Sequence, residues 1–142
     1  MPTEYILAYH CAPAFAGIKP SNIASCSKRE NPNITVQIKM LNEKLNKNDI
    51  YIDVLCECGE RVLLMVYRKQ KLCEYLQRDD IKSFLCDNGY PKEFSLMKYL
   101  AIIKSRIYAQ RLMNKEFPHE IGAFLGYPLH DIYGFINHKH QG

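Results

Sequence analysis

The sequence predicts an α+β fold in which a small antiparallel sheet is covered by five to seven helices. Two β-rich segments, 50–58 and 61–68, are separated by only two residues, Gly59 and Glu60, which is the spacing of a hairpin. After residue 68 the apolar residues recur with helical periodicity. Helices that follow a hairpin favour this class over a parallel doubly wound sheet.

Size and composition limit the class of protein. The chain has 142 residues, 47% hydrophobic and 24% charged, with a formal net charge of +4, and these values are typical of one folded domain spanning residues 1–142. Its apolar runs are far shorter than the roughly 18 to 20 residues of a membrane helix. The N-terminus lacks the basic region of a signal peptide. We therefore expect a cytoplasmic protein without membrane contact, with its six cysteines mostly reduced and buried.

The first fifty residues predict four elements. A helix from Glu4 is interrupted at Pro13, which lacks an amide hydrogen and fits the first turn of a second short helix. Segment 21–27 is the candidate third strand, although its alternation is weak. From Ile34 to Leu45 the apolar residues are spaced by four, three and four, which predicts an amphipathic helix.

The hairpin strands differ in pattern. In the first strand the side chains expected on one face are Ile52, Val54, Cys56 and Cys58, which alternate with Tyr51, Asp53 and Glu57. The second is apolar at every position from 62 to 67, so we expect it to be the more central strand, buried on both faces.

The second half predicts helices only. One lies around residues 72–76, and another runs from an Asp79 cap to an Asn88-Gly89 stop. Ser95 is expected to cap a longer helix, on which two short C-terminal helices opened by Pro118 and Pro128 should pack. The side chains predicted to bury this terminal pair are Ile121, Phe124, Leu125, Ile132 and Phe135.

The terminal pair has the spacing of a helix-turn-helix, with Gly126 in the turn. Its second helix offers Asp131, Tyr133 and Gly134 where a DNA reader supplies basic or amide side chains. Residues 117–142 hold one Lys against two acidic residues, a net of −1, whereas residues 89–116 hold six basic against two acidic, a net of +4. Nucleic-acid binding is therefore the less favoured interpretation, and a structural helix pair is favoured.

Two pairs of residues could carry chemistry. His10-Cys11, with Lys19 nearby, has the residue types of a thiol nucleophile. His119-Glu120 stands at a helix start, where we interpret the carboxylate as a cap, with ligand orientation as the alternative. Two thiols at positions 56 and 58 lack the two further ligands of a structural zinc site, so no metal site is predicted. The two His of the C-terminal tail suit only adventitious metal binding.

Several of these motifs together resemble an uncharacterised family, domain of unknown function 3793, over about residues 5–136. The matching segments are Tyr9 to Pro13, Ala16 to Asn22, Val66-Tyr67-Arg68, Gly89-Tyr90, Phe117 to Pro128, Asp131 and Gly134 to Ile136.

This resemblance implies an origin among anaerobic Firmicutes, an iron or redox context, and no established activity. It also implies a further C-terminal stretch containing Trp, and since this sequence has no Trp and ends at Gly142 we expect it to lack that extension. We further hypothesise that the matching polar residues share one pocket: His10, Cys11, Lys19, Tyr67, Arg68, His119 and Glu120.

Three functions follow as hypotheses. The favoured one is a non-catalytic accessory protein that binds a small ligand, a cofactor or a redox- or iron-related protein partner. The alternatives are a helix-turn-helix-like nucleic-acid-binding regulator and an enzyme that uses Cys11 with His10 or His119. The sequence identifies no cofactor.

Overall fold

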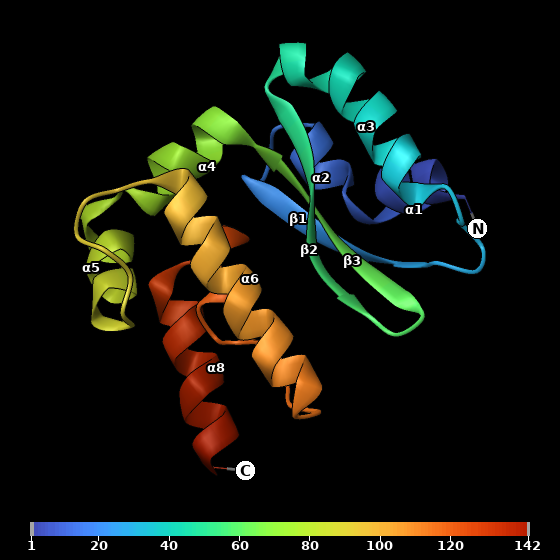
Figure 1. Cartoon of the computed structure of the whole chain (residues 1–142). Helices are drawn as coiled ribbons and strands as arrows, with labels where there is room; N and C mark the ends of the chain where they lie inside the picture. Colours follow the sequence, from blue (N-terminus) through green and yellow to red (C-terminus); the bar gives the residue numbers. More distant parts are fainter. Residues whose placement is uncertain (1, 142) are drawn as a thin grey trace. The chain divides into compact units, whose positions relative to one another are not determined.

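A three-stranded antiparallel sheet organises the N-terminal half of the chain (Figure 1). In the computed structural model, which describes residues 2–141 except for the side chains of residues 135 and 137–141, the strands are β1 (Ser21–Ser27), β2 (Ile50–Cys58) and β3 (Arg61–Arg68). Their order is β1-β3-β2, so β3 is central, as its apolar pattern predicts. The hairpin and the third strand are both confirmed.

The chain forms two compact units, Met1–Leu72 and Cys73–Gly142, and each is described by itself. The boundary falls within α4 (Lys69–Leu76). Across the described residues there are eight α-helices and one 3-10 helix, η1 (Asn46–Asn48), so five to seven helices was an underestimate. Two of the expected short helices, α2 (Ala12–Phe15) and α7 (Ile121–Phe124), have four residues each.

Three helices pack on one face of the sheet in the first unit. They are α1 (Thr3–His10), α2 and α3 (Ile34–Leu45), which contact β1, β3 and β2 respectively. The break at Pro13 and the helix from residue 34 are confirmed. Alternate side chains of β3 point into this core, whose buried members include Leu7, Cys11, Ala14, Cys26, Ile38, Ile52, Val62, Leu64 and Val66.

Hydrogen bonds from side chains fix the edges of this unit. Asn42 of α3 accepts from the Ile52 amide at 2.8 Å and donates to the Ile52 carbonyl at 2.9 Å, which satisfies backbone groups on the outer edge of β2. At the other edge, the buried Asn31 Oδ1 accepts from both the amide and the hydroxyl of Thr3 at 2.9 Å. These two bonds hold the start of α1 against the chain that follows β1.

β2 contains a β-bulge at Leu55, so the prediction that residues 52, 54, 56 and 58 share one face is wrong. Val54 pairs with Leu64, but Cys56 already pairs with Leu63, the next residue along β3. The extra residue reverses the alternation, because one inserted residue moves all later side chains to the other face. Cys56 and Cys58 therefore share a face with each other but not with Ile52 and Val54.

The second unit is helical. After α4 come α5 (Asp79–Asp87), α6 (Leu96–Leu112), α7 and α8 (Leu129–Gln141). Ser95 caps α6 as predicted, accepting from the Lys98 amide at 3.4 Å, whereas Asp79 is the first helical residue of α5 rather than its cap. The positive φ of Gly126, 82°, makes the turn between α7 and α8.

The terminal helix pair is buried through four of the five predicted side chains, and the fifth, Phe135, lies outside the described side chains. Ile121, Phe124, Leu125 and Ile132 are each 9% exposed or less. The ring centroids of Phe124 and Tyr90 are 6.1 Å apart, and those of Tyr133 in α8 and Phe84 in α5 are 5.6 Å apart. Among the described residues, no helix combines the length and the apolar character needed to cross a membrane.

Phe124 provides a test of this core. It is fully buried, so Phe124→Ala should lower the free energy of unfolding by roughly 3 to 5 kcal/mol through lost burial and a residual cavity. Denaturant titration followed by far-ultraviolet circular dichroism measures the change. Met97→Ala, at a position 84% exposed, is the control and should cost less than about 0.5 kcal/mol. A loss below about 1 kcal/mol for Phe124→Ala would mean that the helix pair is peripheral.

Candidate functional site

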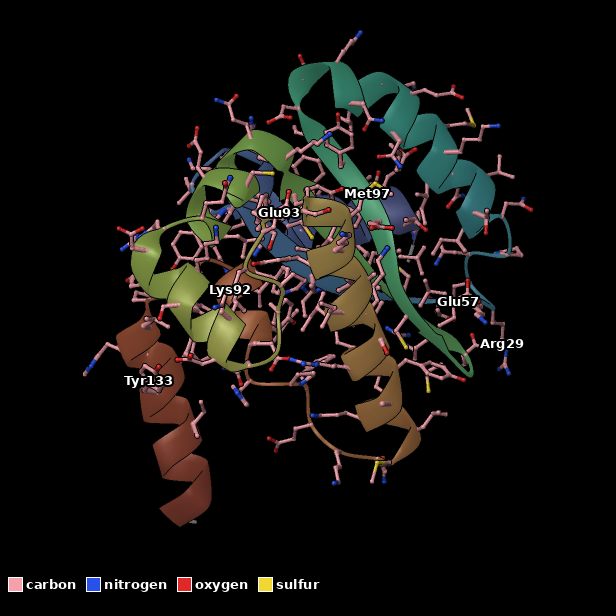
Figure 2. All side chains as sticks on the ribbon, turned by 60° about the vertical axis from the view of Figure 1, so that its left-hand side comes forward. Arg29, Glu57, Lys92, Glu93, Met97 and Tyr133 are labelled. Atoms are coloured by element: carbon pink, nitrogen blue, oxygen red, sulfur yellow. The ribbon has the colours of Figure 1, made fainter. Side chains whose placement is uncertain are left out.

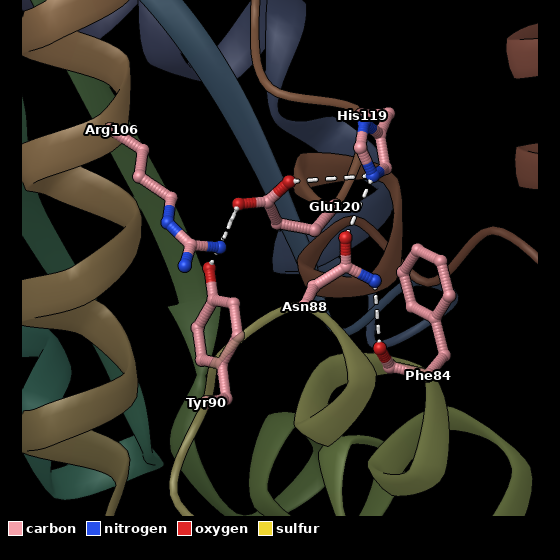
Figure 3. A network of polar contacts seen from close by, with 6 residues as sticks. All are labelled: Phe84, Asn88, Tyr90, Arg106, His119 and Glu120. Carbon is pink, nitrogen blue, oxygen red and sulfur yellow. Dashed lines mark hydrogen bonds and ion pairs between the residues drawn. The ribbon is translucent and has the colours of Figure 1, made fainter.

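A network of polar side chains surrounds Glu120 in the second unit (Figure 3). Glu120 directly precedes α7, and its side chain is only 3% exposed. Arg106 of α6 donates to Glu120 Oε1 at 2.7 Å, and the Tyr90 hydroxyl reaches the same oxygen at 3.4 Å. The buried carboxylate thus accepts hydrogen bonds from a cation, Arg106 of α6, and from a neutral hydroxyl, Tyr90, which follows α5.

These contacts correct the cap interpretation of Glu120. The residue occupies the position before α7, yet its side chain makes no capping hydrogen bond to that helix. A helix of four residues has a weak dipole, whereas a guanidinium at hydrogen-bond distance offers a full opposite charge. The carboxylate therefore ties the start of α7 to α6 instead.

The electrostatics of the network follow from burial and from the ion pair. Burial raises the pKa of the Tyr90 hydroxyl, and the Glu120 charge raises it further, so Tyr90 stays a neutral donor. Burial alone would lower the pKa of Arg106, but the hydrogen bond and charge of Glu120 raise it overall. The Arg106 guanidinium also lies 5.0 Å from the centroid of the Tyr90 ring, in cation–π geometry.

Gly89 leaves room for this arrangement. Its φ is +92°, and a Cβ at this position would lie 2.9 Å from Arg106 Nη2. A free arginine could move away cheaply, but here Glu120 and Tyr90 hold the guanidinium. Glycine is therefore required both by the backbone conformation and by the position of Arg106.

His119 lies at the solvent side of the network. Its Nε2 is 3.0 Å from Asn88 Oδ1 and 3.9 Å from Glu120 Oε2, and Asn88 donates in turn to the Phe84 carbonyl at 2.8 Å. The side chain is 41% exposed, and Figure 3 shows the other ring nitrogen directed away from the network. His119 is thus an oriented imidazole that could accept or donate one hydrogen bond outward.

Cys11 of the first unit is buried, unlike a catalytic thiol. Its side chain is fully enclosed in the core. Burial raises the pKa of the Cys11 thiol to about 12, with Cys26 adding to the rise and Lys19 opposing it. His10 is exposed, and its ring lies 4.9 Å from the Tyr9 ring, edge to face.

Arg68 closes the C-terminal end of α2. Its Nε donates to the Ala14 carbonyl at 2.8 Å, and its Nη2 donates to the Phe15 carbonyl. Asn22 Oδ1 accepts from the Ala14 amide at 2.9 Å, and Lys71 donates to the Gly17 carbonyl. The two Arg68 bonds supply donors to carbonyls at the end of this helix, so Arg68 has a structural role in this position.

The seven predicted pocket residues are divided between the units. Tyr67 is buried and stacks on Tyr51 with ring centroids 5.5 Å apart, and Lys19 is half-buried. His10, Cys11, Lys19, Tyr67 and Arg68 belong to the first unit, and His119 and Glu120 to the second. Within the first unit Lys19 lies close enough to Cys11 to affect the pKa of its thiol, and in the second unit His119 and Glu120 are adjacent. A shared pocket stays a prediction.

Sequence reasoning missed Asn88, Tyr90 and Arg106 as members of the network. Gly89-Tyr90 is among the segments that carry the family resemblance, and this was the available signal. The Arg106 pairing could not be predicted, because helical spacing does not reveal that a carboxylate fourteen residues later pairs with it.

Metal binding has no candidate cluster among the described side chains: no three His, Cys, Asp or Glu lie close enough together to hold an ion. The side chains of the tail His138 and His140 lie outside the described ones. The helix-turn-helix interpretation also loses geometric support, since α7 is a single turn of four residues.

The two units define a small α+β protein in which polar motif residues tie helices together. The chain belongs to the family described as Protein of unknown function (DUF3793), whose model matches residues 7–142. Neither the curated proteins nor the solved structures contain a match to this chain.

Gly89→Ala tests how tightly the network holds Arg106. Gly59, with φ +58° and open space around it, supplies a matched control in which only the backbone strain changes. Both alanine variants should lose about 1 kcal/mol from positive φ, and Gly89→Ala should lose about 1 kcal/mol more by displacing the guanidinium. Equal losses in thermal or denaturant unfolding would show that Arg106 moves freely.

Proposed function

We propose that this chain is a non-catalytic accessory protein that acts by binding another protein. The observation that carries the proposal is the state of Cys11, the best nucleophile candidate. A thiol enzyme needs an accessible thiolate beside a base or a cation. Cys11 is instead fully buried, and burial raises its pKa to about 12.

The other polar residues of the motifs support the same proposal. Arg68 is engaged by the carbonyls at the end of α2, and Glu120 by Arg106. Groups engaged in this way stabilise the fold, and the charge of Glu120 is already compensated by Arg106. Binding of a partner would therefore use the exposed surface of the protein and not these groups.

The setting of the proposed partner comes from the family resemblance. We propose an iron- or redox-related protein in the cytoplasm of an anaerobic bacterium, with a small ligand or cofactor as the other kind of bound molecule. Nucleic-acid binding is not proposed, because the first helix of the pair, α7, is a single turn and the second carries Asp131 in its first turn, where a DNA reader supplies basic or amide side chains.

The test is to recover the tagged full-length chain from its host under anoxic conditions after mild crosslinking in the cell. Native mass spectrometry then reports every bound molecule. We expect one protein at a fixed ratio to this chain, absent from a tagged unrelated control. Recovery of the chain with neither a protein nor a small molecule bound would contradict the proposal.

Cys11 labelling tests the non-catalytic part. With a pKa of about 12, about one Cys11 thiol in ten thousand is ionised at pH 8, and its burial blocks access as well. Iodoacetamide should therefore modify Cys11 at least 100-fold more slowly than Cys58, which is only half-buried. Peptide mass spectrometry after timed quenching measures both rates, and faster labelling of Cys11 would restore the thiol-enzyme hypothesis.

A further inference from the structure

Helix α6 has apolar residues on two sides. One side is buried in the second unit through Tyr99, Leu100, Ile103 and Ile107. On the other side Met97, Tyr108 and Leu112 are 84%, 50% and 64% exposed, and Ala101 between them is exposed too. Figure 2 shows Met97 at the beginning of this helix.

The four exposed residues lie along one side of the helix as two pairs, with Lys104 and Ser105 in the gap between the pairs, and we call them the α6 stripe: Met97, Ala101, Tyr108 and Leu112. Their spacing of four, seven and four places them within about 60° of the helix circumference, over a length of about 22 Å. Single exposed apolar residues are normal on a protein surface, but aligned ones that include Met and Tyr are typical of interaction sites.

Basic residues flank the stripe. At about 100° per residue, Lys104 and Arg111 fall on one side of it and Lys98 on the other. Residues 89–116 carry six basic and two acidic residues, a net of +4. Arg106 pairs with Glu120 in the second unit, so its charge is not counted toward the stripe.

We propose that the α6 stripe is the docking surface for one acidic amphipathic helix of the partner protein. This inference rests on the proposed function and specifies the chemistry of the partner. Two apolar pairs on one side of a helix, each with a spacing of four residues, fit the seam of a second helix, which buries residues spaced by three and four. Glutamate or aspartate beside that seam would complement the flanking Lys98 and Arg111.

Two other occupants fit less well. A second copy of this chain would place α6 against α6 and bring like charges together along the whole seam. A membrane surface is bound by amphipathic helices with wide apolar faces, whereas an apolar stripe of about 60° is narrower than the roughly 100° that such packing faces cover.

The first test uses designed 21-residue helical peptides, labelled with fluorescein, with Leu at the seam and either Glu or Lys elsewhere. In fluorescence anisotropy the Glu peptide should bind the full-length protein at least tenfold tighter than the Lys peptide at low salt, and weaken as salt rises. The double variant Tyr108→Asp with Leu112→Asp should reduce binding of the Glu peptide at least tenfold.

An exposed apolar pair on α3 supplies the matched control. Val36 and Met40 are 57% and 54% exposed and stand four residues apart, like Tyr108 and Leu112. Val36→Asp with Met40→Asp should leave the affinity for the Glu peptide unchanged, and circular dichroism checks that both double variants fold. Equal binding of the two peptides, or equal loss in the two variants, would overturn the proposal.

The second test identifies the natural occupant. A photoreactive benzoylphenylalanine replaces Tyr108 in the host, and in a control strain it replaces Met40. We expect the Tyr108 probe to capture a partner peptide rich in Asp and Glu with apolar residues every three or four positions. Capture of a second copy of this chain, of lipid or of a non-acidic segment would overturn the assignment.

The outcomes separate this inference from the proposed function. If a partner co-purifies but the Tyr108 probe does not reach it, or the Tyr108 and Leu112 double variant still retains it, the α6 stripe is not the docking surface and the proposed function stands. If no partner or ligand co-purifies with the unaltered chain, the proposed function fails.

Discussion

Glu120 places a negative charge where almost no solvent reaches it, and the second unit is arranged around the need to compensate that charge. An isolated carboxylate in such a position would be strongly unfavourable. Arg106 supplies the opposite charge at 2.7 Å, and the Tyr90 hydroxyl supplies a second donor to the same oxygen. These two partners come from α6 and from the segment after α5, so one carboxylate ties three segments together.

The same principle explains the motif residues of the first unit. The end of α2 leaves backbone carbonyls without helical partners, and Arg68 reaches across from the end of β3 to bond two of them. Asn22 bonds the Ala14 amide from β1. Polar residues that look reactive in the sequence are thus used to satisfy backbone groups, and Cys11 beside them is a small buried core residue.

The elements of the fold could be predicted from local sequence, because strand alternation, helical spacing and turn residues act over a few positions. The hairpin, the strand at 21–27, the break at Pro13 and the Ser95 cap are all of this kind. The bulge at Leu55 could not be predicted, since the three apolar residues Val54, Leu55 and Cys56 fit either face of a strand and do not show which of them is inserted. The partner of Glu120 was missed for a similar reason: ion pairing depends on tertiary contacts, and Arg106 fits a solvated helix face equally well.

The central claim is that the charged motif residues stabilise the fold through specific pairs. A double-mutant cycle of Arg106→Met, Glu120→Gln and the combined variant, measured by denaturant unfolding, tests it most directly. Each single change leaves one partner unmatched, while the double change removes both charges. A coupling free energy of at least about 1.5 kcal/mol between the two sites is predicted, and a value under about 0.5 kcal/mol would contradict the account.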